Sequence, residues 1–403
     1  MNLSRFTNKV SAKRVNLYVA HILLFILPFE PKLVPPVLML FIITNLACHS
    51  WTERVFYFKK RWKYILMFSS LYILNIIGLL YTDNMPAGLF QLEVQLSLLI
   101  IPLTVLTSNV INKFTLPELL KTYVVGVIIA FVLCMIYATV AFIKHGDSSV
   151  FYYTHLSYFL HPGYFAMYAN MALSIILIYI FHSKDKVKWR YYVALSLLII
   201  CVFQLSSRTG LIVLAFLLFY GVLSLVLPRI RWRNQFRTYM FAILITAAGL
   251  TVSYQFIKST RVSDVGKELT SSSSSAGSRL AMWKSSYEVF KEHPIAGYGA
   301  GDAKDVMQAK FREDRLAYAV VKNLNVHDEY IQVLISYGII GFIALILPMV
   351  YPLKFVFKGT NFLYLLFIGN VGFNFLTESV LETQAGNVFY GVMWSLLYFT
   401  WKD

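Results

Sequence analysis

The sequence predicts an all-α polytopic membrane protein with about 12 transmembrane helices and a large helical extracytoplasmic loop between the ninth and tenth. The first indication is composition, because 58% of the 403 residues are hydrophobic and only 14% are charged, unlike the balance of soluble domains. The second is a series of apolar runs near the length that crosses a bilayer. The third is a long polar segment, 257–327, that interrupts this series.

The apolar runs define the expected spans in chain order. They lie near 16–29, 33–47, 63–81, 90–106, 118–143, 160–182, 191–206, 211–227, 237–256, 328–353, 361–376 and 387–400. The first run is followed by "PFEPKLVPP" and further spans rather than by a small-residue cleavage site, so we expect an uncleaved helix. The chain is thus expected to divide into spans one to nine (1–256), the loop (257–327) and spans ten to twelve (328–403).

The basic residues predict how the chain is oriented. Its net charge is +16, but the charges follow the expected topology instead of forming one patch, which argues against nucleic acid as a partner. Clusters of Lys and Arg flank the spans on one side, at 5–14, 54–63, 184–190 and 229–237, whereas the opposite short connections hold only Lys32, Lys144 and Arg208. By the positive-inside rule, we expect both termini to be cytoplasmic and the loop to face outward, into the periplasm or the equivalent space.

The polar loop has a recognisable internal order. The serine run "TSSSSSAGS" (270–278) has too little apolar surface to pack. We expect Arg279 to open a helix whose apolar face is Met282, Trp283, Tyr287 and Phe290, and His293-Pro294 to end it. "IAGYGAG" (295–301) favours a tight turn over a dinucleotide site, because no strand precedes it. The charges of 302–319 are expected to form a solvated face, and the three cysteines, all in or beside spans, to act as small apolar residues.

Three residues are the main candidates for chemistry on the outer side. Arg208 lies in a connection of a few residues, where a guanidinium needs an anionic partner; lipid phosphate, Glu378 or Glu382 could also supply it. Arg279 at a helix start would form an anion cradle, although an ordinary exposed Arg is the simpler interpretation. His327 lies where the loop re-enters the membrane and could act as a general base, or simply mark the boundary.

Together these residues resemble the O-antigen ligase and polymerase family of polytopic membrane glycosyltransferases. The matching stretches are "SSRTGLIVLAF", "SRLAMWKSSYEVFKEHPIAGYGAG" and "HDEYIQVLISYGIIGFIALI", which fall in the C-terminal half. The resemblance implies an inverting transfer of a glycan from a polyprenyl-diphosphate donor, without metal or cofactor. It also implies that Arg208 and Arg279 bind the diphosphate and that His327 deprotonates the acceptor hydroxyl. Asp328 stands where such proteins often have Asn, which could raise the basicity of the imidazole or reflect a different acceptor.

Other polar residues are secondary candidates. His161 could line the acceptor cleft or begin a helix, and Glu378 and Glu382 would share a helix face if their stretch is helical, where they could bind a cation, steer an acceptor amine or balance Arg208. The expected activity is ligation of a lipid-linked glycan onto lipid A-core or a similar acceptor, with membrane lipids as surroundings. A polymerase of the same family is the alternative. A transporter is disfavoured, because the spans carry few charges, Glu93 being the main exception.

Overall fold

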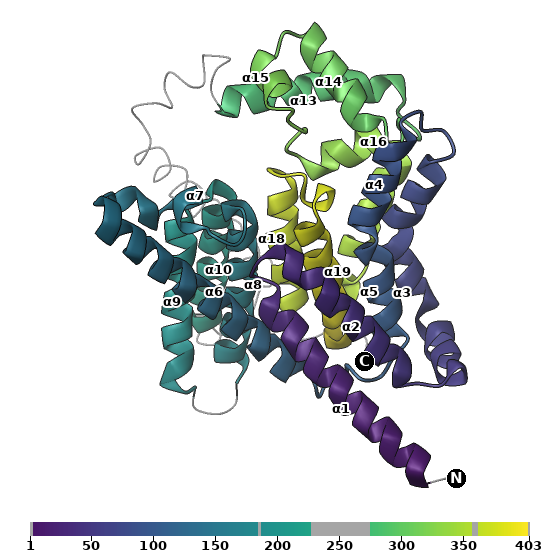
Figure 1. Ribbon diagram of the computed structural model, residues 1–403, viewed down its shortest axis with the longest axis vertical. Helices are drawn as coiled ribbons and strands as arrows, with labels where there is room; N and C mark the ends of the chain where they lie inside the picture. Colours follow the sequence, from purple (N-terminus) through teal and green to yellow (C-terminus); the bar gives the residue numbers. More distant parts are fainter. Residues whose placement is uncertain (1–2, 184–186, 227–274, 357–361, 402–403) are drawn as a thin grey trace, which may run out of the picture. The chain divides into compact units, whose positions relative to one another are not determined.

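The computed structural model describes residues 3–183, 187–226, 275–356 and 362–401, and every regular element in these ranges is a helix (Figure 1). This confirms the all-α class. The predicted ninth span (237–256) and the first part of the loop (257–274), which holds most of the serine run, lie outside the described residues. The chain divides into two compact units. Unit 1 is Met1–Thr44, Asn112–Thr260 and Thr360–Phe373; unit 2 is Asn45–Ile111, Arg261–Gly359 and Asn374–Asp403.

Unit 1 is built around helix α8, whose residues are mostly buried. Its helices are α1 (Leu3–Ile26), α2 (Val34–Ala47), α6 (Leu116–His145), α8 (Pro162–His182), α9 (Trp189–Leu205), α10 (Arg208–Val226) and α18 (Leu363–Phe375), with the short turns η1 (Pro31–Leu33), η2 (Ser148–Phe151) and α7 (Tyr153–Leu156). Helix α8 packs on α6, α9 and α10. The Tyr123 hydroxyl donates to the carbonyl of Tyr168 at 2.9 Å, so a buried phenol is satisfied inside this bundle.

Unit 2 combines a membrane bundle with the described part of the polar loop. Its helices are α3 (Trp51–Gly78), α4 (Met85–Gln95), α5 (Ser97–Leu106), α13 (Ser275–Glu292), α14 (Ala303–Glu313), α15 (Ala317–Val321), α16 (Glu329–Val350), α17 (Leu353–Val356) and α19 (Gln384–Trp401), with the turn η4 (Val380–Glu382). Helix α3 packs on α5 and α16, and α19 packs on α5. Figure 1 shows α13, α14 and α15 gathered beyond the start of α16.

The length and apolarity of several helices suit a multi-pass membrane protein. Within the part of the chain that the structure describes, four stretches can cross a bilayer by these measures: Met85–Leu106, Leu116–His145, Pro162–Phe181 and Glu329–Phe355. A fifth is added if Pro31–Ala47 and Trp51–Gly78, which are bent by 108° at their junction, count as one broken span. Every other predicted span within the described ranges also coincides with a helix, but several of these are too short to meet the same test. The count of 12 spans therefore stays a prediction.

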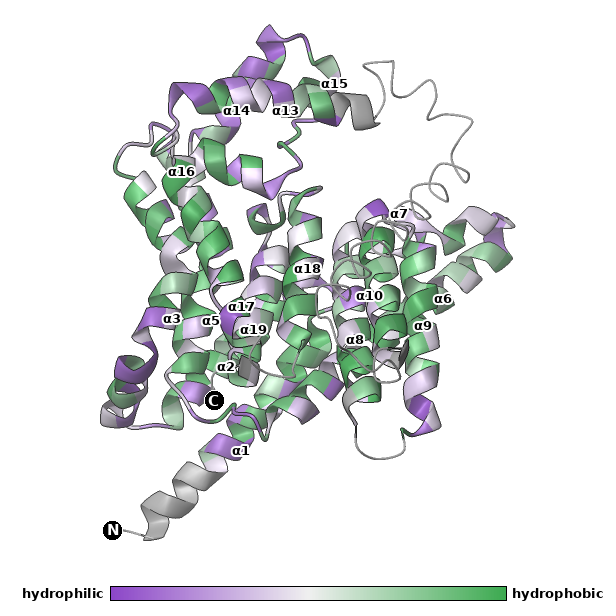
Figure 2. Ribbon diagram, turned by 180° about the vertical axis from the view of Figure 1, so that it is seen from behind, coloured by the Kyte–Doolittle hydropathy of each residue, from purple (hydrophilic) through white to green (hydrophobic). Residues whose placement is uncertain are grey.

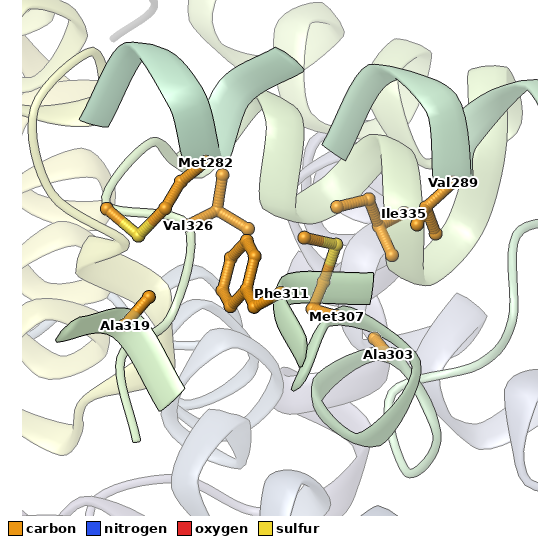
Figure 3. Close-up of a cluster of buried hydrophobic side chains, with 8 residues drawn as sticks. All are labelled: Met282, Val289, Ala303, Met307, Phe311, Ala319, Val326 and Ile335. Carbon is orange, nitrogen blue, oxygen red and sulfur yellow. The ribbon is translucent and has the colours of Figure 1, made fainter. Parts of the chain in front are cut away.

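The described part of the loop forms a small hydrophobic core together with Ile335 of α16 (Figure 3). It consists of Met282, Val289, Ala303, Met307, Phe311, Ala319, Val326 and Ile335. Helices α13 and α14 carry many hydrophilic residues on their other faces, whereas α16 is mostly hydrophobic (Figure 2). The predicted apolar face of α13 is partly wrong, because Tyr287 is 61% exposed. The reason is that α14 packs on the face of Met282 and Val289, which is rotated away from Tyr287.

The glycine-rich segment 295–301 runs against a kink in α16. The N–H of Tyr298 donates to the carbonyl of Ile335 at 3.0 Å, and the N–H of Gly299 donates to that of Ser336 at 2.8 Å. Gly297 has φ +67°, and a Cβ there would lie 2.5 Å from the Ile335 carbonyl oxygen. Glycine therefore permits close approach of two backbones. The segment serves as a structural turn, as predicted, and α13 ends at Glu292, before His293-Pro294, also as predicted.

Candidate active site

Within unit 2, one carboxylate joins the two principal candidates of the polar loop. Glu378 Oε1 lies 3.2 Å from Arg279 Nη2, and Glu378 Oε2 lies 3.0 Å from His327 Nδ1. All three side chains are only partly buried, with exposed fractions of 33% for Arg279, 24% for His327 and 23% for Glu378. The arrangement thus combines a cation, an imidazole and an acid at a surface that a polar substrate can reach.

His327 is held by contacts on both sides of it. Its own N–H donates to Asn325 Oδ1 at 3.2 Å, and the indole N–H of Trp283 on α13 donates to the carbonyl of Val326 at 3.2 Å. His327 has φ +53°, a left-handed conformation that is uncommon for a residue other than glycine and often marks a functional position. These contacts fix the backbone from which the imidazole projects.

Asp328 caps helix α16. Its Oδ1 accepts the N–H of Ile331 at 2.9 Å, and its backbone is extended, as expected of an N-cap. Burial raises the pKa of Asp328 to about 6, while the hydrogen bond from Ile331 acts in the opposite direction. Capping accounts for this carboxylate, and its predicted effect on the basicity of His327 remains a prediction.

Arg279 lies one turn inside a helix rather than at its start. Helix α13 begins at Ser275, so the prediction that Arg279 opens the helix was wrong. The backbone N–H groups left free at a helix N-terminus belong to the first four residues, and Arg279 is the fifth. The helix therefore includes Ser275, Ala276, Gly277 and Ser278, although serine and glycine are weak helix formers. The charge available at this position is therefore that of the guanidinium itself.

Glu378 and Glu382 do not share a helix face. Helix α18 ends at Phe375, Glu378 lies in a bend, and Glu382 ends the 3₁₀ turn η4, so the helical expectation was wrong. Glu382 Oε1 accepts from Gln91 Nε2 at 3.0 Å, away from the partners of Glu378. Burial raises the pKa of Glu382 to about 7, opposed by the nearby charge of Lys304. The two acids have separate partners because the chain between them is extended and turned rather than α-helical.

Sequence reasoning missed Glu329, the first residue of α16. It is 1% exposed, and its Oε2 accepts the N–H of Leu381 at 2.7 Å. Its burial and this hydrogen bond, which the sequence does not report, distinguish it from its polar neighbours. Asp302 was also missed as an anchor. Its carboxylate accepts from the backbone N–H of Asp83 at 2.8 Å and of Asn84 at 2.7 Å, so this charge is not simply part of a solvated face.

The other two predicted residues belong to unit 1. Arg208 is the first residue of α10 and is partly exposed. Beside it, Ser207 Oγ accepts the N–H of Gly210 at 3.3 Å, which caps that helix. His161 is the N-cap of α8, where its Nδ1 accepts the N–H of Gly163 at 3.3 Å. The helix-start interpretation of His161 is thus the one that the geometry supports.

No group of three or more His, Cys, Asp or Glu side chains that could hold a metal ion occurs within the described residues. The three cysteines, Cys48, Cys134 and Cys201, are buried and unbridged. The predicted interpretation of these cysteines as small apolar residues agrees with their burial.

Comparison with known proteins connects this geometry to a family. The sequence model of a family described as O-Antigen ligase matches residues 193–346, a range that contains Arg208, Arg279 and His327 but stops before Glu378. An uncharacterized protein of Haemophilus influenzae is 28% identical over 152 residues, which make up 35% of this chain and 38% of that protein. The match therefore spans little more than a third of this relative. Residues 193–346 are thus similar to the O-Antigen ligase family, which confirms the resemblance seen in the sequence.

Proposed function

We propose that the protein is a glycosyltransferase that moves a glycan from a polyprenyl-diphosphate donor to a hydroxyl of lipid A-core or a similar surface acceptor. The observation that carries this proposal is the contact of one carboxylate, Glu378, with both His327 and Arg279. An imidazole fixed by an acid beside a free guanidinium edge is suited to removing one proton and balancing the charge of a departing phosphate.

His327 acts as the general base in this proposal. Its Nδ1 carries the proton that points to Glu378, which leaves Nε2 as the acceptor for the proton of the attacking hydroxyl. The hydroxyl oxygen forms a bond to the anomeric carbon from the face opposite the diphosphate. The bond from that carbon to the phosphate oxygen breaks, and its electron pair leaves with the diphosphate. One carbon–oxygen bond is made, one is broken, and the configuration inverts.

Arg279 can bind the diphosphate without leaving Glu378. A guanidinium carries five N–H donors in a planar fork, and among the described residues the hydrogen bond that Arg279 donates is the one from Nη2 to Glu378. Because its side chain is 33% exposed, the remaining donors can reach an outer ligand. Arg208 is assigned the same task on the basis of its charge and of its place in the matched range. Asp328 serves as the cap that places His327, and His161 could contact the acceptor.

The proposed site lies on the outer, periplasmic face of the inner membrane, with both chain termini in the cytoplasm. Two hydrogen-bonding clusters at opposite ends of unit 2 support this topology. Tyr81 donates to the carbonyl of Ala296 at 2.9 Å, so the α3–α4 connection lies beside the polar loop. In the first half of α3, Arg61 donates to the carbonyl of Leu106 at 3.1 Å and lies over the ring of Tyr398. The basic cluster of 54–63 is thus separated from the polar loop by the second half of α3.

The decisive experiment is a transfer assay with purified protein in lipid nanodiscs. A labelled polyprenyl-diphosphate glycan is offered with lipid A-core and, separately, with a second molecule of donor. His327→Ala should lower turnover about 10²–10⁴-fold, whereas His145→Ala, which removes an exposed histidine of α6, should not. Transfer onto lipid A-core identifies a ligase, and chain growth on the donor identifies a polymerase. Wild-type activity should persist in EDTA. Undiminished transfer by His327→Ala would overturn the proposal.

A labelling experiment tests the topology separately. In a variant without the natural cysteines, Cys is placed at Tyr287, which is exposed on α13, and in a second variant at Thr52 near the start of α3. A membrane-impermeant maleimide is added outside intact inner-membrane vesicles of each orientation. In vesicles that keep the periplasmic face outward it should label the cysteine at position 287 but not the one at position 52, and in inverted vesicles the reverse. Labelling of both from the same side would contradict the assigned topology.

A further inference from the structure

Two segments of unit 2 are joined by a pair of neighbouring contacts. One is the contact of His327 Nδ1 with Glu378 Oε2 at 3.0 Å, which is partly exposed. The other is the hydrogen bond from the N–H of Leu381 to Glu329 Oε2 at 2.7 Å, which is buried. The partners are two residues apart on one segment and three apart on the other. The buried contact therefore sets the spacing at which the exposed contact can form.

The segment that carries Glu378 has little regular structure of its own. It contains only the three-residue turn η4 between α18 and α19, so its position depends on bonds to other helices. The Leu381 carbonyl accepts from Asn387 Nδ2 at 2.7 Å and from Gln95 Nε2 at 3.4 Å, which hold it to α19 and α4. The Leu381 N–H donates to Glu329 and thereby holds the same residue to α16, directly after His327.

We infer that Glu329 is a positioning residue, whose side chain holds the Glu378 segment against the start of α16 so that Glu378 can orient the His327 imidazole. The inference rests on the proposed function for its catalytic consequence, but not for the contact itself. Glu329 touches no substrate in this account. Its side chain is long enough for Oε2 to accept the N–H of Leu381, and this contact keeps the Glu378 segment in place. The placement matters because a shift of catalytic groups by about 1 Å can lower the rate on the order of 10²-fold.

Two explanations of how Glu329 acts, by the length of its side chain or by its charge, predict opposite orders of impairment among its variants. Glu329→Gln keeps the length of the side chain and an acceptor oxygen but has no charge, whereas Glu329→Asp keeps the charge but is one methylene shorter. If reach matters, Glu329→Gln should resemble the wild type and Glu329→Asp should be impaired, with Glu329→Ala impaired most. Ser69→Ala is a matched control, because it removes another buried hydrogen bond of unit 2, from Ser69 to the carbonyl of Leu98.

The first measurement is hydrogen–deuterium exchange of peptides that cover 376–383, in the full-length protein. Exchange should become faster in Glu329→Ala and Glu329→Asp, and stay unchanged in Glu329→Gln and Ser69→Ala. Because exchange does not depend on catalysis, this result stands even if the wild type transfers no glycan, an outcome that would overturn only the proposed function. Unchanged exchange in both Glu329→Ala and Glu329→Asp would overturn the inference.

The second measurement is kcat in a double-mutant cycle with Glu378→Gln. Glu329→Asp alone should lower kcat roughly tenfold or more, up to about 10²-fold, with the KM for the donor unchanged. In the Glu378→Gln background the same substitution should have little further effect, because residues that act through one contact are not additive. If the two losses multiply, or if Glu329→Gln is the worse variant, Glu329 does not act by positioning Glu378.

Discussion

Glu378 Oε2 lies 3.0 Å from Nδ1 of His327, although 51 residues separate them in the chain. The other oxygen of the same carboxylate holds Arg279 at 3.2 Å. A single acid thus fixes the orientation of the proposed base, His327, relative to Arg279, which is proposed to bind the diphosphate. This relationship makes Glu378 the residue whose chemical change tests the site most directly.

Glu378→Gln should lower kcat on the order of 10²-fold through loss of orientation. Both partners present donors, so an amide can satisfy only one of them with its oxygen, and its NH₂ group faces the other. The measurement is steady-state transfer by the nanodisc-embedded protein. Glu118→Gln is the control, because Glu118 also pairs with a cation, Lys121 at 2.6 Å, on α6. Equal rates for Glu378→Gln and Glu118→Gln would show that the contact has no role in turnover.

Arg279→Lys should raise the KM for the donor and lower kcat, while the protein still inserts and folds. A lysine ammonium is a point charge that cannot span Glu378 and a phosphate with a planar fork. Arg208→Lys should behave in the same way if Arg208 also binds the diphosphate, and Arg315→Lys, at an exposed loop position, should be neutral. Near-normal kinetics of both Arg279→Lys and Arg208→Lys would assign the diphosphate to other residues.

Much of the fold could be predicted from apolar runs, because a helix that crosses a membrane must be apolar over a fixed length. The start of α16 beside His327 and the structural turn at 295–301 also followed from local sequence. The buried face of α13 could not be predicted in the same way. Packing against α14 decides which of its apolar residues are buried, and Tyr287 remains exposed. Tertiary packing sets this choice, and one sequence does not record it.

The candidate site was predictable only in part. His327, Arg279 and Glu378 could each be selected by charge, yet their contact joins distant segments and no spacing in the sequence reports it. Glu378 was considered as one of several partners for Arg208, which stays a prediction, and its contacts with Arg279 and His327 were not foreseen. Glu329 escaped notice because it is adjacent to two other polar residues and looks like part of a hydrophilic helix start. Only its burial and its bond to Leu381 distinguish it.

Gly338→Ala should destabilise the protein more strongly than alanine at Gly146, another glycine with positive φ. Gly338 has φ +62° and ψ −157°, a conformation that is nearly exclusive to glycine, and a Cβ there would lie 2.3 Å from the backbone of Ile295. Gly146 is left-handed α, with φ +70°, ψ 5° and nothing within 4 Å of its Cβ, so Gly146→Ala should cost only about 1–2 kcal/mol of backbone strain. Thermal unfolding in nanodiscs compares them. Similar Tm losses would show that segment 295–301 can move away from α16 at little cost.

The stability of the wild type relative to Glu382→Gln should fall as the pH rises from about 4.5 to about 7. Burial raises the pKa of Glu382 from the ordinary glutamic acid value of 4.5 to about 7, so the folded protein holds this proton more tightly than the unfolded chain. The stabilisation is therefore complete below the unfolded pKa and lost as the pH passes through the folded pKa. Glu382→Gln cannot titrate and keeps an acceptor for Gln91, so its Tm should vary less with pH in this window.

The measurement compares the two proteins with each other, because burial also raises the pKa of Asp328, to about 6, and this group is present in both. The Tm of each protein is recorded at intervals from pH 4 to 8, with Glu118→Gln as a carboxylate control that should follow the wild type. Parallel curves for the wild type and Glu382→Gln would mean that Glu382 keeps an ordinary pKa and is solvated in the folded protein.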